Sequence, residues 1–399
     1  MKQLTFKHTL AASYAGYITQ AAVNNLPPLL FTAFCRDFDI TVTQISSLIT
    51  ANFVTQITVD GISVKFLDRI GMRAAAVAAH FFTVLGFILM GTLPFIISPF
   101  AGLVIAMIIC AIGGGLTEVV ISPIVEALPG DEKASAMSML HSFYCWGQAG
   151  VVLLSTLYFV TIGSENWRWL PVIWALFPLL NMFLFMKVPI NELIAEDETP
   201  TPLKELFSMK IFYVLMLLMI CAGASELAMS QWSSYFAESG LKVSKTAGDL
   251  LGPCGFALLM GTARLIYGIK GSKIPLEKMM KLSCVLCVAS YFTAVFSPIP
   301  VLSLIGCSVC GFSVGILWPG TFSIASRTCP KGGGAMFALL ALAGDLGCSA
   351  GPGLVGIVSG DSGTLTKGLL AAVIFPAAML ILMLMLRSDN PEANNADSQ

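Results

Sequence analysis

Some acidic residues of this 399-residue chain stand deep inside long apolar stretches. Glu118 lies within the segment GGGLTEVVISP at 113–123, and Glu226 and Asp345 lie in two later apolar stretches. A charged side chain at the centre of a membrane-spanning helix costs roughly 2.5–3.5 kcal/mol on insertion scales, and such residues usually line a cavity, form a pair or carry protons. We therefore predict that Glu118, Glu226 and Asp345 are candidate proton-coupling residues.

Uncharged polar side chains recur at helical spacing in the same stretches. The first stretch carries a row with spacings of four, three and four residues: Ser13, Tyr17, Gln20 and Asn24. This spacing places the row on one helical face. Pro27 and Pro28 then interrupt the helix, and the carbonyls that they leave unpaired suit the wall of a cavity. Amides, a phenol and flat indoles could bind a polar solute, and they form the predicted substrate-binding set: Gln20, Asn24, Asn25, Asn52, Gln56, Tyr144, Gln148, Trp232 and Trp318.

The same residues have a structural alternative. Polar side chains also join membrane helices through hydrogen bonds worth about 0.6 kcal/mol each. For Asn52 and Gln56 this alternative stays open beside a cavity-lining role, and Trp232 and Trp318 could equally pack against lipid or other helices. His141 is predicted to be a structural histidine near one end of its helix.

Metal and phosphate sites are not indicated. The two Cys-x-x-Cys pairs at 284–287 and 307–310 lie in apolar segments without a nearby histidine, so we predict that they pack in the core. The glycine-rich pieces at 113–115 and 332–334 are not phosphate loops, because the first lies within a membrane segment and the second lacks the Lys-Ser/Thr ending of such a loop. We expect no metal, no cofactor and no enzymatic activity.

The composition indicates a membrane protein. The chain is 56% hydrophobic and 11% charged, whereas soluble domains have about 25% charged residues. A helix needs about 20 mostly apolar residues to span a bilayer. Twelve segments meet this need, near 9–34, 43–66, 74–93, 98–128, 134–162, 168–188, 210–238, 246–269, 277–296, 299–328, 333–359 and 365–387. The prediction is an all-α protein in a lipid bilayer, and the net charge of −1 indicates no nucleic-acid partner.

The basic residues predict the orientation. The two termini and the loops on their side of the membrane carry 16 of the 22 Lys and Arg residues, the opposite loops carry 5, and Arg264 lies within the eighth segment. Positively charged loops stay in the cytoplasm. We therefore expect both termini to be cytoplasmic, with the chain in the cytoplasmic (inner) membrane.

The segments divide into two groups of six. The longest polar connection separates residues 1–188, a six-helix bundle, from residues 210–387, a second one, with a cytoplasmic linker at 189–209 and a disordered tail at 388–399. Gly115 and Pro123 are eight residues apart in the fourth segment, as are Gly311 and Pro319 in the tenth. Such repeated halves are typical of secondary transporters, whose substrate site lies between them near the midplane.

The loop LDRIGMR at 67–73 resembles a signature of the major facilitator superfamily, an Asp followed by a Gly and an Arg. The glycine that usually stands four residues before the Asp is Val64 here. The resemblance implies twelve helices in two pseudo-symmetric bundles. It also implies a cytoplasmic gate formed by this loop, with Asp68, Arg69, Gly71 and Arg73 as its residues.

Three further pieces resemble the fucose-permease-like sugar branch of that superfamily. They are Asn24-Asn25-Leu26, the run from Gly115 through Glu118 to Pro123, and the pattern of Gly223, Glu226, Trp232 and Tyr235. The resemblance implies that Glu118 takes part in proton coupling. The acid that follows the Asn-Asn-Leu piece in fucose symporters is replaced by Pro27-Pro28, which weakens an assignment to fucose itself.

The predicted function is secondary active transport of a small polar solute, a sugar in the first instance, by alternating access. Protons are the expected coupling ion, with sodium as an alternative, and one chain is expected to function as a monomer because it supplies both halves. The alternative function is efflux of amphiphilic or drug-like compounds in exchange for protons. The identity of the solute and the direction of transport stay open.

Overall fold

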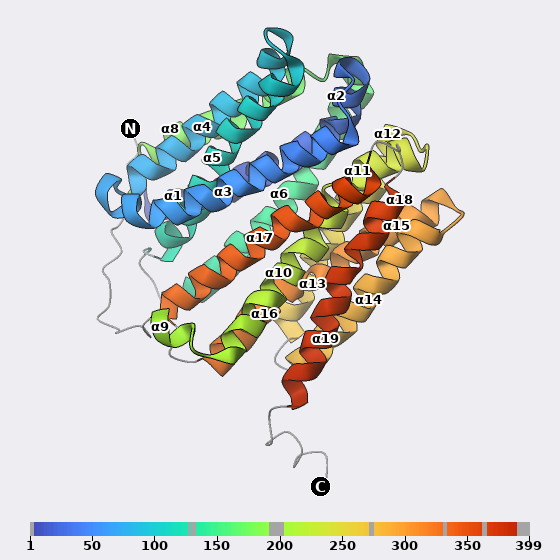
Figure 1. The fold of residues 1–399 in the computed structure, drawn as a ribbon. Helices are drawn as coiled ribbons and strands as arrows, with labels where there is room; N and C mark the ends of the chain where they lie inside the picture. The colour runs from blue at the N-terminus through green and yellow to red at the C-terminus, as the bar shows by residue number, and fades with distance from the viewer. Residues whose placement is uncertain are drawn as a thin grey trace.

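The computed structural model describes residues 4–126, 128, 133–190, 203–270, 275–329, 333–360 and 365–388, and these residues form helices without strands. Most of the predicted linker, at 191–202, and the tail at 389–399 lie outside this range. Figure 1 shows helices α1 to α8 on one side of the molecule and α10 to α19 on the other. The prediction of an all-α membrane fold is confirmed.

The first six predicted segments become eight α-helices and three 3₁₀ turns. The helices and the first of these turns are α1 (Phe6–Asn25), a 3₁₀ turn (Pro27–Leu30), α2 (Phe31–Phe38), α3 (Val42–Ile70), α4 (Met72–Thr92), α5 (Pro99–Glu126), α6 (Lys133–Ile162), α7 (Trp169–Trp174) and α8 (Leu176–Phe185). The 3₁₀ turn between α1 and α2 begins at Pro27, as expected where two prolines remove backbone donors. Short 3₁₀ turns also occur at Leu93–Phe95 and Ser164–Asn166.

The last six segments are more broken. They are α10 (Lys210–Ser230), α11 (Ser233–Tyr235), α12 (Lys245–Asp249), α13 (Gly255–Lys270), α14 (Leu276–Phe296), α15 (Pro300–Val314), α16 (Leu317–Thr328), α17 (Gly333–Ser359), α18 (Thr366–Ala372) and α19 (Ile374–Ser388). Two π-helical turns, Phe236–Gly240 and Leu250–Cys254, flank α12. The short helix α9 (Leu203–Leu206) precedes α10.

Nine helices of the described residues are long and apolar enough to cross a membrane, judged by length and composition. The stretch Trp169–Phe185 is apolar but shorter, and the first two predicted segments do not reach the same hydropathy. Those two segments carry the polar residues Gln20, Asn24 and Gln56, which line a cavity inside the protein. A helix that turns polar side chains inward can span a bilayer with a lower mean hydropathy.

The predicted gate loop at 67–73 is almost entirely helical. Helix α3 continues to Ile70, Gly71 alone separates it from α4, and α4 begins at Met72. Gly71 has a φ of 76°, a backbone conformation that favours glycine over other residues. Arg73 Nη1 donates to the carbonyl of Phe185 at the end of α8, at 2.8 Å. The side chains of Asp68 and Arg69 lie outside the described part of the structure.

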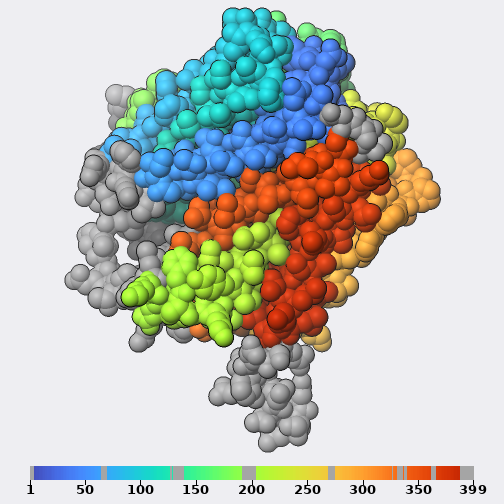
Figure 2. All heavy atoms as spheres, viewed as in Figure 1, coloured from blue at the N-terminus to red at the C-terminus, as the bar shows by residue number. Residues whose placement is uncertain are grey.

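The two groups of helices meet along α3 with α17 and along α6 with α13. Figure 2 shows the first of these contacts as a long seam on one face. The groups are tied together most closely at the end formed by α2, α11 and α12, which we call the closed end (Figure 1). At this end four hydrogen bonds between described residues cross from one group to the other: Thr32 Oγ1 to Glu238 Oε2 at 2.8 Å, Gln231 Nε2 to Asn24 O at 2.9 Å, Gln148 Nε2 to Ser230 Oγ at 3.0 Å and Ser46 Oγ to Gly353 O at 3.2 Å.

Aromatic and thiol groups complete the closed end. The rings of Phe31 and Trp232 lie 5.9 Å apart, and Lys245 Nζ lies 4.9 Å from the ring centroid of Phe159. Cys35 lies against Tyr235 from the other group. The closed end is therefore a packed contact between the two groups.

Candidate functional site

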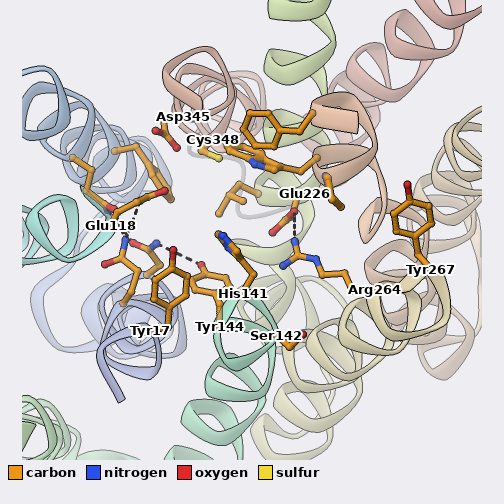
Figure 3. A pocket seen from close by; sticks show the side chains of 18 residues that line it. Tyr17, Glu118, His141, Ser142, Tyr144, Glu226, Arg264, Tyr267, Asp345 and Cys348 are labelled. Atoms are coloured by element: carbon orange, nitrogen blue, oxygen red, sulfur yellow. Dashed lines mark hydrogen bonds and ion pairs between the residues drawn. The ribbon is translucent and has the colours of Figure 1, made fainter. Parts of the chain in front are cut away.

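A cavity of about 410 Å³ lies between the two groups of helices. It is lined by residues of both groups: Tyr17, Gln20, Asn24, Phe53, Gln56, Glu118, His141, Ser142 and Tyr144 from the first, and Glu226, Leu227, Arg264, Tyr267, Trp318, Pro319, Phe322, Asp345 and Cys348 from the second. Figure 3 shows Glu118 on one side and the Glu226–Arg264 pair on the other, with His141 and Tyr144 between them. Its volume falls within the range of about 300–1,000 Å³ that small-molecule sites occupy.

A chain of carboxamides leads to Glu118. Gln20 Nε2 donates to Glu118 Oε2 at 3.3 Å and to Gln56 Oε1 at 3.0 Å. Gln56 Nε2 in turn donates to Asn24 Oδ1 at 2.9 Å, and Asn24 Nδ2 reaches the Tyr144 hydroxyl at 3.5 Å. Each amide has both donors and acceptors, so this wall of the cavity can exchange hydrogen bonds with the hydroxyls of a solute.

Two further carboxylates lie near Glu118. Asp60 is in α3, one turn beyond Gln56, and its buried Oδ1 has no hydrogen-bond partner among the described residues. Asp345 lies on α17, close enough to both Glu118 and Asp60 for electrostatic interaction. Three acids from α3, α5 and α17 therefore share the region between the two groups. Asp60 was not among the predicted residues, although its spacing of four residues from Gln56 places both on one face of α3.

The only ion pair that lines the cavity within the described residues joins Glu226 of α10 to Arg264 of α13. Arg264 Nη2 lies 3.6 Å from Glu226 Oε2, Nη1 lies 3.2 Å from Cys145 Sγ, and Nε donates to the carbonyl of Gly315 at 3.3 Å. The contact with Cys145 of α6 crosses between the two groups. Arg264 was also not predicted as a site residue, although it is the single basic residue within its predicted membrane segment, 246–269.

Four of the predicted substrate-binding residues do not line the cavity. Asn52 Nδ2 donates to Asn24 Oδ1 at 3.4 Å and so supports a residue that does. Gln148 Nε2 donates to Ser230 Oγ at 3.0 Å, and Asn25 Nδ2 donates to the Ala21 carbonyl at 2.9 Å. Trp232 is fully buried, and its indole N–H donates to the Pro352 carbonyl at 3.0 Å. Each of these four side chains donates a hydrogen bond within the protein.

The two tryptophans of the prediction therefore lie in different places. Trp318 lines the cavity, whereas Trp232 packs in the closed end. Gly344 makes room for Trp318, because a Cβ atom at position 344 would collide with the indole ring. His141, expected to be structural, is exposed where it lines the cavity, and its ring meets Tyr17 edge-on with centroids 5.3 Å apart.

Other candidate chemistry is not assembled. Among the described residues no group of three His, Cys, Asp or Glu side chains could hold a metal ion. The two Cys-x-x-Cys pairs lie on α14 and α15, where the buried Cys287 and Cys310 have their Sγ atoms 3.9 Å apart. The site is a cavity lined by amides, acids and aromatic rings.

Comparison with known proteins now identifies the family. The sequence profile of the Major Facilitator Superfamily matches residues 13–352. The chain belongs to this superfamily. Comparison with curated protein sequences finds no match. The superfamily consists of transporters rather than enzymes, so the chain is an integral membrane transporter. The family predicted from the loop signature and from the repeated halves is confirmed.

Solved structures of major facilitator transporters share the fold. A bacterial homologue of the human lysosomal transporter Spinster, inward-facing and occupied, has a TM-score of 0.76 and 13% identity, with 97% of each chain covered. The nucleoside transporter NupG has a TM-score of 0.76 and 11% identity, covering 95% of this chain and 98% of that one. The E. coli fucose:proton symporter FucP has a TM-score of 0.65 and 15% identity, covering 94% and 98%. At these identities the likeness concerns the fold.

Proposed function

We propose that this transporter moves a small polar solute of the sugar type across the cytoplasmic membrane together with a proton. The observation that carries the proposal is the hydrogen bond from Gln20 to Glu118 in a cavity between the two groups of helices. It joins an ionisable acid to a wall of amides that suits hydroxyl groups. A bound solute can therefore sense whether Glu118 is protonated, and coupling needs such a difference in affinity between two states.

The two halves, residues 1–188 and 210–387, would rock about this cavity, with the linker 189–209 between them. The closed end, formed by α2, α11 and α12, also contains the C-terminal ends of α6, α10 and α17 (Figure 1), and the positive-inside rule assigns these ends to the outside. On this assignment the structure represents an inward-open state with both termini in the cytoplasm. The turn at Gly71, with Asp68, Arg69 and Arg73 around it, would then belong to the inner gate.

The relatives support a solute with a hydroxylated ring. FucP is a fucose:proton symporter and NupG is a nucleoside transporter, and a nucleoside also contains a sugar ring. The indole of Trp318 offers the flat apolar face on which such a ring can lie, opposite amides that can bind its hydroxyls. Hydrogen bonds on one side and an aromatic face on the other are what an amphipathic ring requires.

The test is uptake into proteoliposomes that contain the purified protein. With acid outside and alkaline buffer inside, we expect accumulation of at least one labelled pentose, hexose, sugar acid or nucleoside. A protonophore, which removes the pH gradient, should abolish this accumulation. Liposomes without protein are the control. Accumulation that persists in the presence of the protonophore would contradict proton coupling. The absence of uptake for the whole panel would contradict the proposal that the solute is of the sugar type.

A second function has one observation in its favour. Phe53, Leu227 and Phe322 give the cavity apolar walls, and these would suit an amphiphilic compound exported in exchange for protons. Export predicts that such a compound, added to proteoliposomes with acid inside, discharges the proton gradient. The sugar proposal predicts no discharge by amphiphiles.

The two tryptophans provide a matched pair for the substrate contact. We expect Trp318→Ala to raise the half-saturating solute concentration about ten- to hundredfold, because a ring contact and its buried area are worth about 1.5–3 kcal/mol. Trp232→Phe should leave that concentration unchanged, since Trp232 does not line the cavity, and should lower the melting temperature through the lost bond to Pro352. Equal effects of both variants on affinity would contradict the assignment.

A further inference from the structure

Arg264 is a permanent cation inside a membrane-spanning helix, and it lines the cavity. Its guanidinium carries five N–H donors in a planar fork. Its contacts with a thiol, a backbone carbonyl and a carboxylate leave that fork loosely satisfied, because a thiol is a weak acceptor. The nearest carboxylate oxygen of the described residues is Glu226 Oε2, at 3.6 Å from Nη2.

A structural role would be to neutralise Glu226. An arginine built for that purpose holds the carboxylate at about 2.7–2.9 Å, usually through two parallel bonds. Here the pair is single and longer, and Nη1 points to Cys145 of the other group. The N–H donors of the Arg264 guanidinium can therefore bind a ligand oxygen that is a stronger hydrogen-bond acceptor than the groups that the protein supplies.

The surroundings of Arg264 also suit an anion. Figure 3 shows His141 and Tyr144 facing the cavity near the guanidinium, while Glu118 lies on the far side. The acids Glu118 and Asp345 and the amide wall are thus separated from the cation by the width of the cavity. A solute with a carboxylate at one end and hydroxyls at the other would match this arrangement.

We propose that Arg264 binds the carboxylate of the transported solute and that this solute is a sugar acid of the hexuronate kind. The inference rests on the proposed function, since it places a sugar-like solute in the same cavity. The carboxylate takes the two Nη donors, the hydroxyls meet Gln20, Gln56 and Asn24, and Glu226 gives up its hold on Arg264. Because Arg264 touches Cys145, the bound anion also bridges the two halves.

The proposal has an electrical consequence. One carboxylate and one proton together carry no net charge, so their joint uptake is electroneutral. A neutral sugar with one proton moves a positive charge and responds to the membrane potential. Potassium gradients with valinomycin should therefore leave uronate uptake unchanged at a fixed pH gradient.

Binding is tested first, by thermal shift of the purified full-length protein in detergent. The probes are D-glucuronate and D-galacturonate, with D-glucose and D-galactose as the matched neutral sugars. We expect at least one uronate to bind about tenfold or more tightly than its neutral partner, as the loss of a charge-assisted bond predicts. Equal binding of acid and sugar, or no binding of either uronate, overturns the proposal.

Variants separate the ligand role from the structural role. Arg264→Gln should abolish the preference for the acid, and Glu226→Gln should keep it, because Glu226 competes with the ligand. If Arg264 serves only to neutralise Glu226, the double variant Arg264→Gln/Glu226→Gln restores uronate binding, and this result overturns the proposal. Should Arg264→Gln fail to fold, Arg264→Lys keeps the charge without the fork and should weaken uronate binding while leaving binding of the neutral sugar unchanged.

The outcomes also distinguish this inference from the proposed function. If a neutral sugar is taken up in a proton-driven manner and the uptake rate changes with valinomycin, the proposed function is supported and the inference about Arg264 is contradicted. If uronate binding depends on Arg264 but no proton-driven accumulation occurs, the inference about Arg264 is supported and proton coupling is contradicted.

Discussion

Glu118→Gln is expected to abolish proton-driven accumulation of the solute and to preserve its exchange down a concentration gradient. The glutamine keeps the size of the side chain and can still bond Gln20, so the cavity and the binding of solute should survive. It has no proton to gain or lose, so the pH gradient has no means of acting on the solute. Accumulation should fall to the level of liposomes without protein, while counterflow stays within about twofold of wild type.

The measurement is paired uptake and counterflow in the same proteoliposomes over a range of external pH. The control is Glu277→Gln, the same change at an exposed position at the start of α14, which should behave as wild type. Proton-driven accumulation that persists in Glu118→Gln with unchanged pH dependence would contradict the role of Glu118. In that case Asp60 and Asp345 become the acids to replace with Asn.

Gly356→Trp is expected to arrest the transporter with its closed end forced apart. A Cβ atom at position 356 would already collide with Ser46 of α3 and would come within 3.2 Å of the Trp232 ring. A tryptophan there cannot fit between α17 and α3 while the seam is closed. The state with a closed end becomes inaccessible, so counterflow and accumulation should both be lost although the protein still folds.

The arrest can be read from one introduced thiol. Ser230 is 5% exposed and its hydroxyl accepts a hydrogen bond from Gln148 at the closed end. The cysteine of Ser230→Cys should react slowly with a membrane-impermeant maleimide. It should react at least about tenfold faster when Gly356→Trp is added. The labelling rate at this position is measured by peptide mass spectrometry. Gly150→Trp is the matched control, since a Cβ atom at position 150 meets nothing within 4 Å. An unchanged labelling rate, or full transport by Gly356→Trp, would contradict the prediction that the tryptophan forces the closed end apart.

The sequence was informative about the helices because a membrane leaves few choices. Apolar length, the two prolines at 27–28 and the spacing of Gln20 and Asn24 depend on local chemistry, and each has a counterpart in the structure. The gate loop was less well predicted, because a single glycine with positive φ can join two helices without any further loop residues. Nothing in the letters of LDRIGMR shows that α3 continues to Ile70.

The sequence did not predict how deep each side chain lies in the helix bundle or which way it points. Trp232 and Trp318 are the same residue type in similar apolar surroundings, but one packs in the closed end and the other lines the cavity. The difference depends on which neighbouring helix leaves space, as Gly344 does for Trp318. Asp60 and Arg264 were visible as charges, but their convergence with residues of other helices is a tertiary fact.

The distribution of thiols at the closed end has a practical consequence. All eleven cysteines are free, ten of them are buried, and Cys35, which lies against Tyr235, is partly accessible. A fluorescent maleimide should therefore react fastest at Cys35, next to the contact that must separate when the closed end opens, and more slowly at Cys348, which lines the cavity. The protein thus carries its own labelling site for following conformational exchange in single molecules, once Cys348 is replaced.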